Sequence, residues 1–249
     1  MEPFQILIAA IALSLGSLVQ GVAGFGLGLV ALPLLLFAGI HLPAALILLI
    51  FSSTAQSLYN LFIYREHFCW RDSVAINGAR LAFMPIGLAI LYLIGDSDPS
   101  RVRQIVGVAI LATVAAQYFL RVKPVEKLHW GWTLLAGGIS GIMGSAIGIG
   151  GPPFVLWCQA HNWSTWRFRT CMWSGLIALA LPMLVALVFM YGATMYPFVG
   201  VAVLLVPLSI LGGKTGSRLG GRLDSKRLRI IVFALLFVTG LTCILDPYF

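Results

Sequence analysis

The sequence predicts an all-α integral membrane protein built as two inverted repeats of five hydrophobic segments each. Three observations lead to this fold class. Sixty percent of the 249 residues are apolar, only 10% are charged and the mean hydropathy is +0.98, which excludes an ordinary soluble domain. A glycine-rich pattern occurs twice, 120 residues apart. Lysine and arginine are concentrated in every second connection between the apolar stretches.

About 20 apolar residues are needed to cross a bilayer as a helix. The apolar stretches are residues 4–22, 27–40, 43–63, 74–94, 101–120, 130–143, 148–160, 168–190, 196–213 and 227–245. We interpret the first as a membrane span and not as a removable signal peptide, because no small-residue cleavage site closes it. The second, sixth and seventh are short and flank the glycine-rich motifs. Short or broken helices are expected there, either as two half-helices or as one re-entrant element.

The basic connections set the orientation. They are residues 64–73, 121–129, 161–169 and 214–229, whereas 41–42, 95–100 and 191–195 contain no lysine or arginine. The positive-inside rule places the basic connections in the cytoplasm and both termini outside. Because each half has an odd number of segments, the second half enters the membrane from the opposite face. The predicted units are repeat 1–120, a cytoplasmic linker 121–129 and repeat 130–249.

The same distribution explains the net charge of +8, so we assign it to membrane topology and expect no nucleic-acid partner. The four cysteines show no C-x-x-C spacing, and no H-E-x-x-H occurs. No metal site, no cofactor and no enzyme activity are therefore expected.

The glycine-rich motifs carry the strongest signal for a binding site. The first runs from Gln20 to Gly28 and is followed by Pro33, and the second runs from Ser140 to Pro153. The fixed offset of 120 pairs Gly21 with Gly141, Gly24 with Gly144, Gly28 with Gly148, Pro33 with Pro153 and His41 with His161. Glycine costs roughly 1 kcal/mol relative to alanine inside a helix. Duplicated, interrupted segments are the best sequence pointer to a transporter's substrate site. Close helix packing through small-xxx-small pairs is the alternative.

The acidic side chains all fall in connections or at the termini, which argues against a carboxylate proton relay or a cation cage within the membrane. They are Glu2, Glu66, Asp72, Asp96, Asp98, Glu126, Asp224 and Asp246. An anionic or neutral guest is therefore favoured. Helix starts within the motifs would offer unpaired N–H groups to an anion. The candidate binding residues of the motifs are Gln20, Gly24, Phe25, Gly26, Gly28, Ser140, Gly144, Ser145, Gly148, Gly150 and Gly151.

Other polar residues extend this candidate site. Gln56 and Asn60 belong to a polar stripe on segment 43–63, which faces either a guest or a neighbouring helix. Arg80, within segment 74–94, either binds an oxyanion with its planar fork or snorkels to the headgroups. His41 and His161 either titrate as gates or anchor the chain at the interfaces.

The doubled glycine and proline windows, their spacing and the absence of intramembrane acids resemble the TauE/SafE family of sulfite and organosulfonate exporters. The resemblance rests on Gly21, Gly24, Gly28 and Pro33, on 137–141 and on 148–153. It covers nearly the whole chain. The first copy departs from the second, because Val30 and Ala31 stand where Gly150 and Gly151 occur. The resemblance implies transport of small sulfur-containing anions across a bacterial cytoplasmic membrane.

These observations combine into one hypothesis, secondary transport of a small sulfur oxyanion by alternating access, with export as the expected direction. The motifs would cradle the anion, and Gln56, Asn60 and Arg80 would complete its shell. The expected partners are the anion and the lipid bilayer, and a homodimer is left open. Two alternatives stay open as well, a channel-like anion pathway and a membrane assembly factor without transport.

Overall fold

The computed structural model describes residues 1–95, 97–119, 122, 124–125, 128–220 and 225–245, with the backbone alone for 225–233 and 235. Within these ranges the chain is helical, and the only strand-like feature is an isolated bridge between Val125 and His161. The predicted all-α class is confirmed. Asp96, Glu126, Asp224, Asp246 and much of the predicted linker 121–129 lie outside the described residues.

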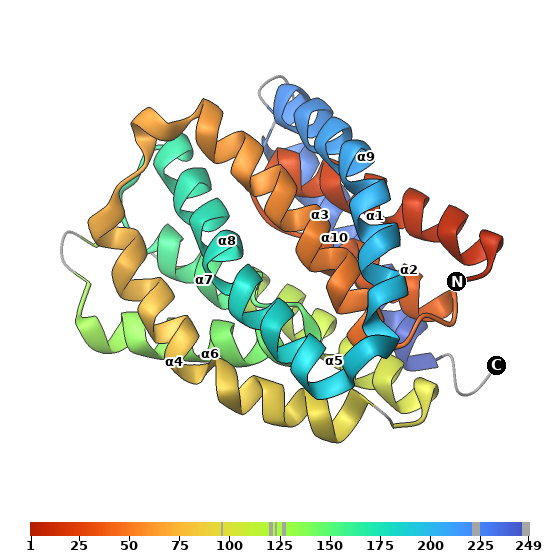
Figure 1. Cartoon of the computed structure of the whole chain (residues 1–249). Helices are drawn as coiled ribbons and strands as arrows, with labels where there is room; N and C mark the ends of the chain where they lie inside the picture. The colour runs from red at the N-terminus through yellow and green to blue at the C-terminus, as the bar shows by residue number, and fades with distance from the viewer. Residues whose placement is uncertain (96, 120–121, 123, 126–127, 221–224, 246–249) are drawn as a thin grey trace.

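The helices follow the apolar stretches closely (Figure 1). Those before the linker are α1 (Pro3–Ala23), α2 (Leu27–Phe37), α3 (Leu42–Ile63), α4 (Trp70–Gly95) and α5 (Pro99–Phe119). Those after it are α6 (Trp130–Ile147), α7 (Gly151–Gln159), α8 (Thr165–Tyr191), α9 (Tyr196–Gly220) and α10 (Ser225–Leu245). Short 3-10 turns, η1 (Arg65–His67) and η2 (Gly192–Met195), precede α4 and α9.

Five helical stretches in the described part of the chain are long and apolar enough to cross a membrane. They are Pro3–Ala23, Leu42–Ile63, Trp70–Gly95, Pro99–Phe119 and Thr165–Gly220, the last of which joins α8, η2 and α9. By contrast, α2 has 11 residues and α7 has nine, so neither can cross alone. The expectation of short helices is therefore confirmed for the second and seventh segments. The sixth segment is longer than expected, because α6 continues to Ile147 and has 18 residues.

Each short helix folds back on the helix before it. Gln5 Nε2 at the start of α1 donates to the carbonyl of Ala38, just after α2, at 3.2 Å. Trp157 Nε1 in α7 donates to Thr133 Oγ1 in the first turn of α6 at 2.9 Å. Both α1–α2 and α6–α7 are thus antiparallel hairpins that break at the glycine-rich motifs. That either hairpin is re-entrant in a membrane stays a prediction.

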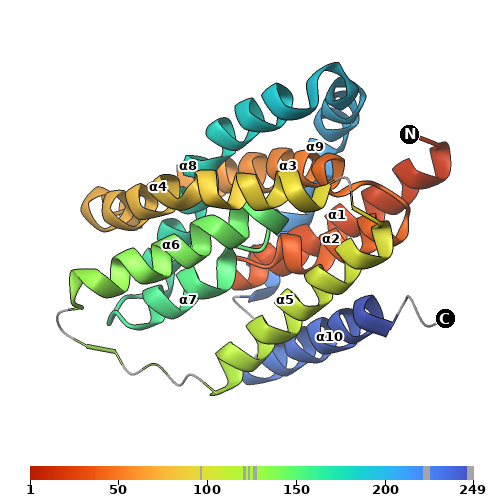
Figure 2. The ribbon, with the colours of Figure 1, turned by 90° about the horizontal axis from the view of Figure 1, so that it is seen from below.

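The two hairpins open toward opposite ends of the helix bundle (Figure 2). One end, called the N-terminal end here, holds the start of α1, the α2–α3 and α8–α9 connections and the end of α10. The other, called the linker end, holds His129, η1 and the α7–α8 connection, where Thr170 Oγ1 donates to the carbonyl of His67 at 3.2 Å. Both hairpin tips therefore lie inside the bundle.

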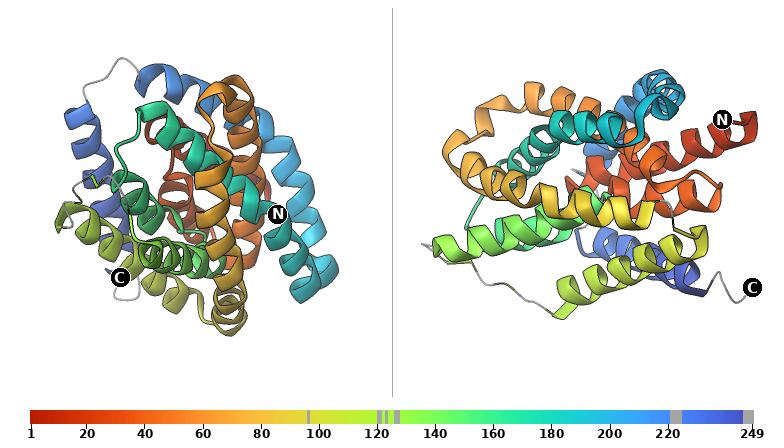
Figure 3. Two further views of the ribbon diagram at one scale, coloured as in Figure 1. Left: turned by 90° about the vertical axis from the view of Figure 1, so that its left-hand side faces the viewer. Right: turned by 60° about the horizontal axis from the view of Figure 1, so that its bottom comes forward.

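Helices of one half pack mainly on helices of the other half (Figure 3). The first helix of each hairpin has such a partner, since α1 packs along α9 and α6 packs along α4. Glycines allow these close approaches: a Cβ on Gly21 would overlap the backbone of Gly213, and one on Gly141 would overlap the backbone of Arg80. The helix-packing explanation therefore holds for Gly21 and Gly141. Because the halves interlock, the boundaries 1–120 and 130–249 stay sequence predictions.

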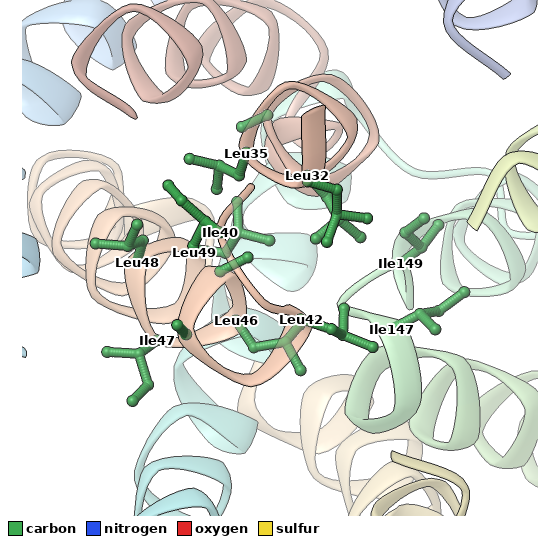
Figure 4. Close-up of a cluster of buried hydrophobic side chains, with 14 of the residues drawn as sticks. Leu32, Leu35, Ile40, Leu42, Leu46, Ile47, Leu48, Leu49, Ile147 and Ile149 are labelled. Atoms are coloured by element: carbon green, nitrogen blue, oxygen red, sulfur yellow. The ribbon is translucent and has the colours of Figure 1, made fainter. Parts of the chain in front are cut away.

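Apolar side chains hold the short helix α2 against α3 and against the second hairpin (Figure 4). Leu32 and Leu35 of α2 are fully buried beside Leu46 of α3. Ile147 and Ile149, at the turn of the second hairpin, belong to the same cluster. In this conformation the cluster brings α2 of the first hairpin into contact with the turn of the second.

The helix ends correct the sequence register between the two motifs. Gly24 and Gly148 end α1 and α6 with left-handed backbone, at φ 86° and 71°. Gly26 and Gly150 precede α2 and α7. Both pairs are 124 residues apart, so the offset of 120 is wrong by about one helical turn. The offset of 120 paired Gly24, which ends α1, with Gly144, which lies inside α6.

This shift changes the place of several predicted residues. Gly144 and Ser145 lie inside α6 and not in the break between the hairpin helices. His41 precedes the first turn of α3, whereas Ser164 precedes that of α8, so His41 and His161 are not equivalent positions.

Candidate functional site

The two hairpin tips touch each other. We call Gly24–Leu29 the first tip and Gly148–Gly151 the second tip. A Cβ on Gly28 would lie 2.6 Å from the carbonyl oxygen of Gly148, and one on Gly151 would lie 3.4 Å from Cδ2 of Phe25. Glycine is therefore needed at Gly28 for the backbones to meet.

A cavity of about 100 Å³ lies between the tips. Its walls come from both tips, from α3 and α8, and from one charged residue, Arg80. The sequence-predicted residues that line it are Gln20, Phe25, Gly26, Gly28, Arg80, Gly144, Gly148, Gly150 and Gly151. Residues in segments 120 positions apart in the sequence thus form one hollow. Sequence reasoning had not included Phe154, Met172 and Leu176, which also line it, because isolated apolar residues in helices give no signal.

Other predicted residues brace the tips without lining the cavity. Ser140 Oγ donates to the carbonyl of Gly150 at 2.5 Å. Ser145 Oγ donates to the carbonyls of Met84 at 3.0 Å and Gly141 at 2.7 Å, which ties α6 to α4. Gly24 forms the αL end of α1. The structure therefore separates residues that face the cavity from residues that shape it.

Arg80 is the charged group of the cavity. Only 3% of the residue is exposed, so it does not snorkel to the surface. Its Nη1 donates to Asn77 Oδ1 at 3.3 Å, and its guanidinium carbon lies 4.9 Å from the centre of the Phe154 ring. Arg80 Nε has no hydrogen-bond partner. Among the described residues, no carboxylate forms an ion pair with Arg80, whereas Asp72 in the first turn of α4 is paired with Arg167.

The helix starts at the tips add further donors. The first bond within α2 runs from Val30 N to the Gly26 carbonyl, so the N–H groups of residues 27–29 have no partner inside the helix. In α7 the corresponding residues are Gly151, Pro152 and Pro153, and proline has no N–H. A buried guanidinium with an unpartnered Nε and unpaired backbone N–H groups around one hollow are groups of the kind that bind anions in proteins.

Comparison with known families supports a transport role for this fold. The family described as sulfite exporter TauE/SafE matches residues 8–243, nearly the whole chain. The chain belongs to the TauE/SafE sulfite exporter family. Together with its apolar helices, this membership makes it a multi-pass membrane protein of a transporter family. Comparison with curated proteins and with solved structures finds no match.

In this TauE/SafE member, Gln56 and Ser57 of the polar stripe of α3 bond to α1. Gln56 Nε2 donates to the carbonyl of Ser17 at 3.1 Å, and Gln20 Nε2 donates to Ser57 Oγ at 3.4 Å. These bonds fit the interhelical role weighed for the stripe. Gln56 and Asn60 do not line the cavity, although Gln56 Oε1 and Asn60 Nδ2 are buried without partners. Their role in binding stays a prediction.

The two candidate gating histidines lie at opposite ends of the TauE/SafE bundle. His41 lines a hollow at the N-terminal end with Ser97 and Tyr191. At the linker end, the ring of His161 stacks on Trp163 at 4.4 Å, and its Nδ1 lies 2.9 Å from the Trp157 carbonyl. The aromatic contacts of His161 fit an anchoring role, and gating by either histidine stays a prediction.

Proposed function

We propose that this protein is a secondary transporter that moves a small sulfur-containing anion, such as sulfite or an organosulfonate, out of the bacterial cytoplasm. The anion occupies the cavity between the two tips. Arg80 and the first-turn amides of α2 bind its oxygens, and Phe25 covers the second tip. Membership of the sulfite exporter family supports the substrate class.

The observation that carries this proposal is the isolated charge of Arg80. Burying a cation without a counter-charge is expensive unless a ligand supplies the charge. Arg80 lies in the wall of the cavity, its Nε is unpartnered, and its planar fork matches the oxygens of a sulfite or sulfonate group. A bound anion would supply both the missing counter-charge and a hydrogen-bond acceptor for Nε of Arg80.

Alternating access follows from the proposed inverted repeats. The two hairpins enter from opposite ends of the bundle, and their tips share one site, so a relative movement of the hairpins opens the site to one end at a time. The basic connections assign the linker end to the cytoplasm and the termini to the outside. An inside-negative potential then favours anion exit by about 2.3 kcal/mol per charge per 100 mV.

The test is a flux assay in proteoliposomes with sulfite, sulfoacetate, taurine and sulfate, together with equilibrium binding. Arg80→Gln is expected to weaken binding roughly a hundredfold, because it removes the charge that a buried anion requires. Arg71→Gln is the matched control, since Arg71 is an exposed arginine at the start of the same helix, and it should transport like the wild type.

Three outcomes contradict the proposal. No flux and no binding for any of the four compounds excludes the substrate class. Non-saturating flux without counterflow exchange indicates a channel-like pathway. Copurification of a partner protein without any flux indicates an assembly factor.

A further inference from the structure

A second, larger hollow lies beside the central cavity. It measures about 660 Å³ and runs between the end of α3, the first half of α4 and the middle of α8. These three helices lie next to one another in Figure 1. We call this hollow the lateral groove. Exposed apolar side chains, including Leu58, Phe62 and Val74, form its outer walls, and Arg65 lies at its linker end.

Two hydrogen bonds connect the lateral groove to the anion site. Asn77 and Ser174 line the groove, and Asn77 Nδ2 donates to Ser174 Oγ at 3.4 Å. Asn77 Oδ1 accepts from Nη1 of Arg80, which lines the central cavity. Both Asn77 and Ser174 are at least nine-tenths buried. One layer of polar side chains therefore separates the groove from the cavity.

Gly175 keeps this layer thin. A Cβ at this position would overlap Nη1 of Arg80 and Cε1 of Phe154, and it would lie 3.1 Å from Asn77 Oδ1. A side chain at position 175 would therefore collide with Arg80 and Phe154 and crowd the groove residue Asn77. Gly175 is not needed to end a helix, since it lies inside α8 and its backbone is not left-handed.

We propose that the lateral groove is a vestibule of the transport site, which takes an organic sulfonate from the linker end and passes it between Asn77 and Ser174 to Arg80. The proposal rests on the transport function proposed above. Arg65, whose guanidinium carbon lies 5.6 Å from the Phe62 ring, places a positive charge beside an apolar wall. A sulfonate with a hydrocarbon part complements both features, because its head pairs with the arginine and its chain contacts the wall. Fully hydrated sulfate has no apolar part to offer.

The test fills the groove without touching the anion site. Ala178 lines the lateral groove and is half-buried, so Ala178→Phe narrows the groove. The probe is 1-butanesulfonate, which has one anionic head and a hydrocarbon chain. Its flux in proteoliposomes is expected to fall at least tenfold, while its equilibrium binding stays within about twofold, because Arg80 and both tips are unchanged. Gly78→Phe is the matched control, since Gly78 is exposed with open space around it and does not line the groove.

Arg65→Gln gives an independent check that does not depend on how well Ala178→Phe folds. It should lower the initial rate about threefold at low ionic strength and less at high ionic strength, because steering by an exposed charge is screened by salt. A rate that equals the wild type at every ionic strength contradicts the vestibule.

The outcomes separate this inference from the proposed function. A wild-type protein that neither binds nor transports any of the four compounds overturns both. A wild-type protein that transports 1-butanesulfonate, with Ala178→Phe transporting it equally fast, overturns the vestibule alone, and so does a wild-type protein that transports sulfite but not 1-butanesulfonate. Phosphatidylglycerol that copurifies with the wild type and is lost in Ala178→Phe, with flux unchanged, assigns the groove to lipid and also overturns the vestibule.

Discussion

The two hairpin tips occupy equivalent places but are built from different backbone. The first tip has two left-handed glycines, Gly24 and Gly26, at φ 86° and 108°. The second has one, Gly148 at φ 71°, and its Gly150 has an ordinary φ of −83°. The first helix turn is free of proline in α2, whereas α7 begins Gly-Pro-Pro.

For the anion binding that we propose, this difference would give the two tips different roles. The first tip supplies unpaired N–H groups, since three of them precede the first bond of α2. The second tip is stiffer, because its prolines fix φ and Ser140 Oγ holds the carbonyl of Gly150. Arg80 stacks on Phe154 of α7 and so supplies charge on the side where the backbone donors are missing. An anion between the tips would thus meet amides on one side and a guanidinium on the other.

The largest effect is expected where the tips touch. Gly28→Leu places a side chain against the carbonyl of Gly148, where even a Cβ would lie at 2.6 Å. Overpacking of this kind costs about 3 kcal/mol, so flux should fall roughly a hundredfold. Gly28→Ala should show a smaller loss in the same direction. Gly78→Leu, in open space, is the control and should transport normally. If Gly28→Leu transports at the wild-type rate, the tips do not need to meet.

An intermediate effect is expected from the groups that anchor each tip. Arg169 Nη2 of α8 donates to the carbonyl of Val22, at the end of α1, at 2.7 Å. Arg169→Gln should lower the free energy of unfolding in detergent by about 2 kcal/mol, because the bond carries a charge. Ser140→Ala should lower it by about 1 kcal/mol, because its bond to Gly150 is neutral. The exposed Arg218→Gln should leave it unchanged. Equal losses for Arg169 and Ser140 would mean that both tips are anchored alike.

The smallest effect is expected from restoring a donor to the second tip. Pro153→Ala returns one N–H to the first turn of α7, so anion affinity in equilibrium binding should rise about threefold. Pro43→Ala makes the same change in the first turn of α3, away from the central cavity, and should leave affinity unaltered. A fall in affinity for Pro153→Ala would show that rigidity at this tip matters more than an added donor.

Much of the fold could be predicted because apolar length and proline or glycine placement act locally. The break between the segments 4–22 and 27–40 was expected and lies at Gly24–Gly26, whereas the seventh segment was expected from 148 and its helix begins at Gly151. The register between the motifs could not be predicted correctly. A packing glycine such as Gly141 and a helix-ending glycine such as Gly148 look alike in the sequence, and only neighbouring backbone tells them apart.

The candidate site shows the same division. Arg80 could be named from the sequence because an arginine in an apolar segment is rare. The environment of Arg80 could not be predicted, because its neighbours Phe154, Asn77 and Gly175 come from three different helices. No local sequence pattern shows which helices pack together. Gln56 and Asn60 do not line the cavity, and a polar stripe in the sequence does not show which neighbouring helix it faces. Their role in binding stays a prediction.

The sequence by itself determined that this chain is an all-helical membrane protein of the TauE/SafE family, with duplicated breaks and no acidic residue within its apolar segments. These properties follow from the sequence because helix breaks depend on residues within a few turns, and because hydropathy is a sum over each segment. Only the tertiary structure decided that the breaks are tips of two hairpins, that the tips are four residues out of the apparent register, and that Arg80 lies between two hollows. Those facts depend on which helices pack together, and packing is set by the complementarity of surfaces far apart in the sequence.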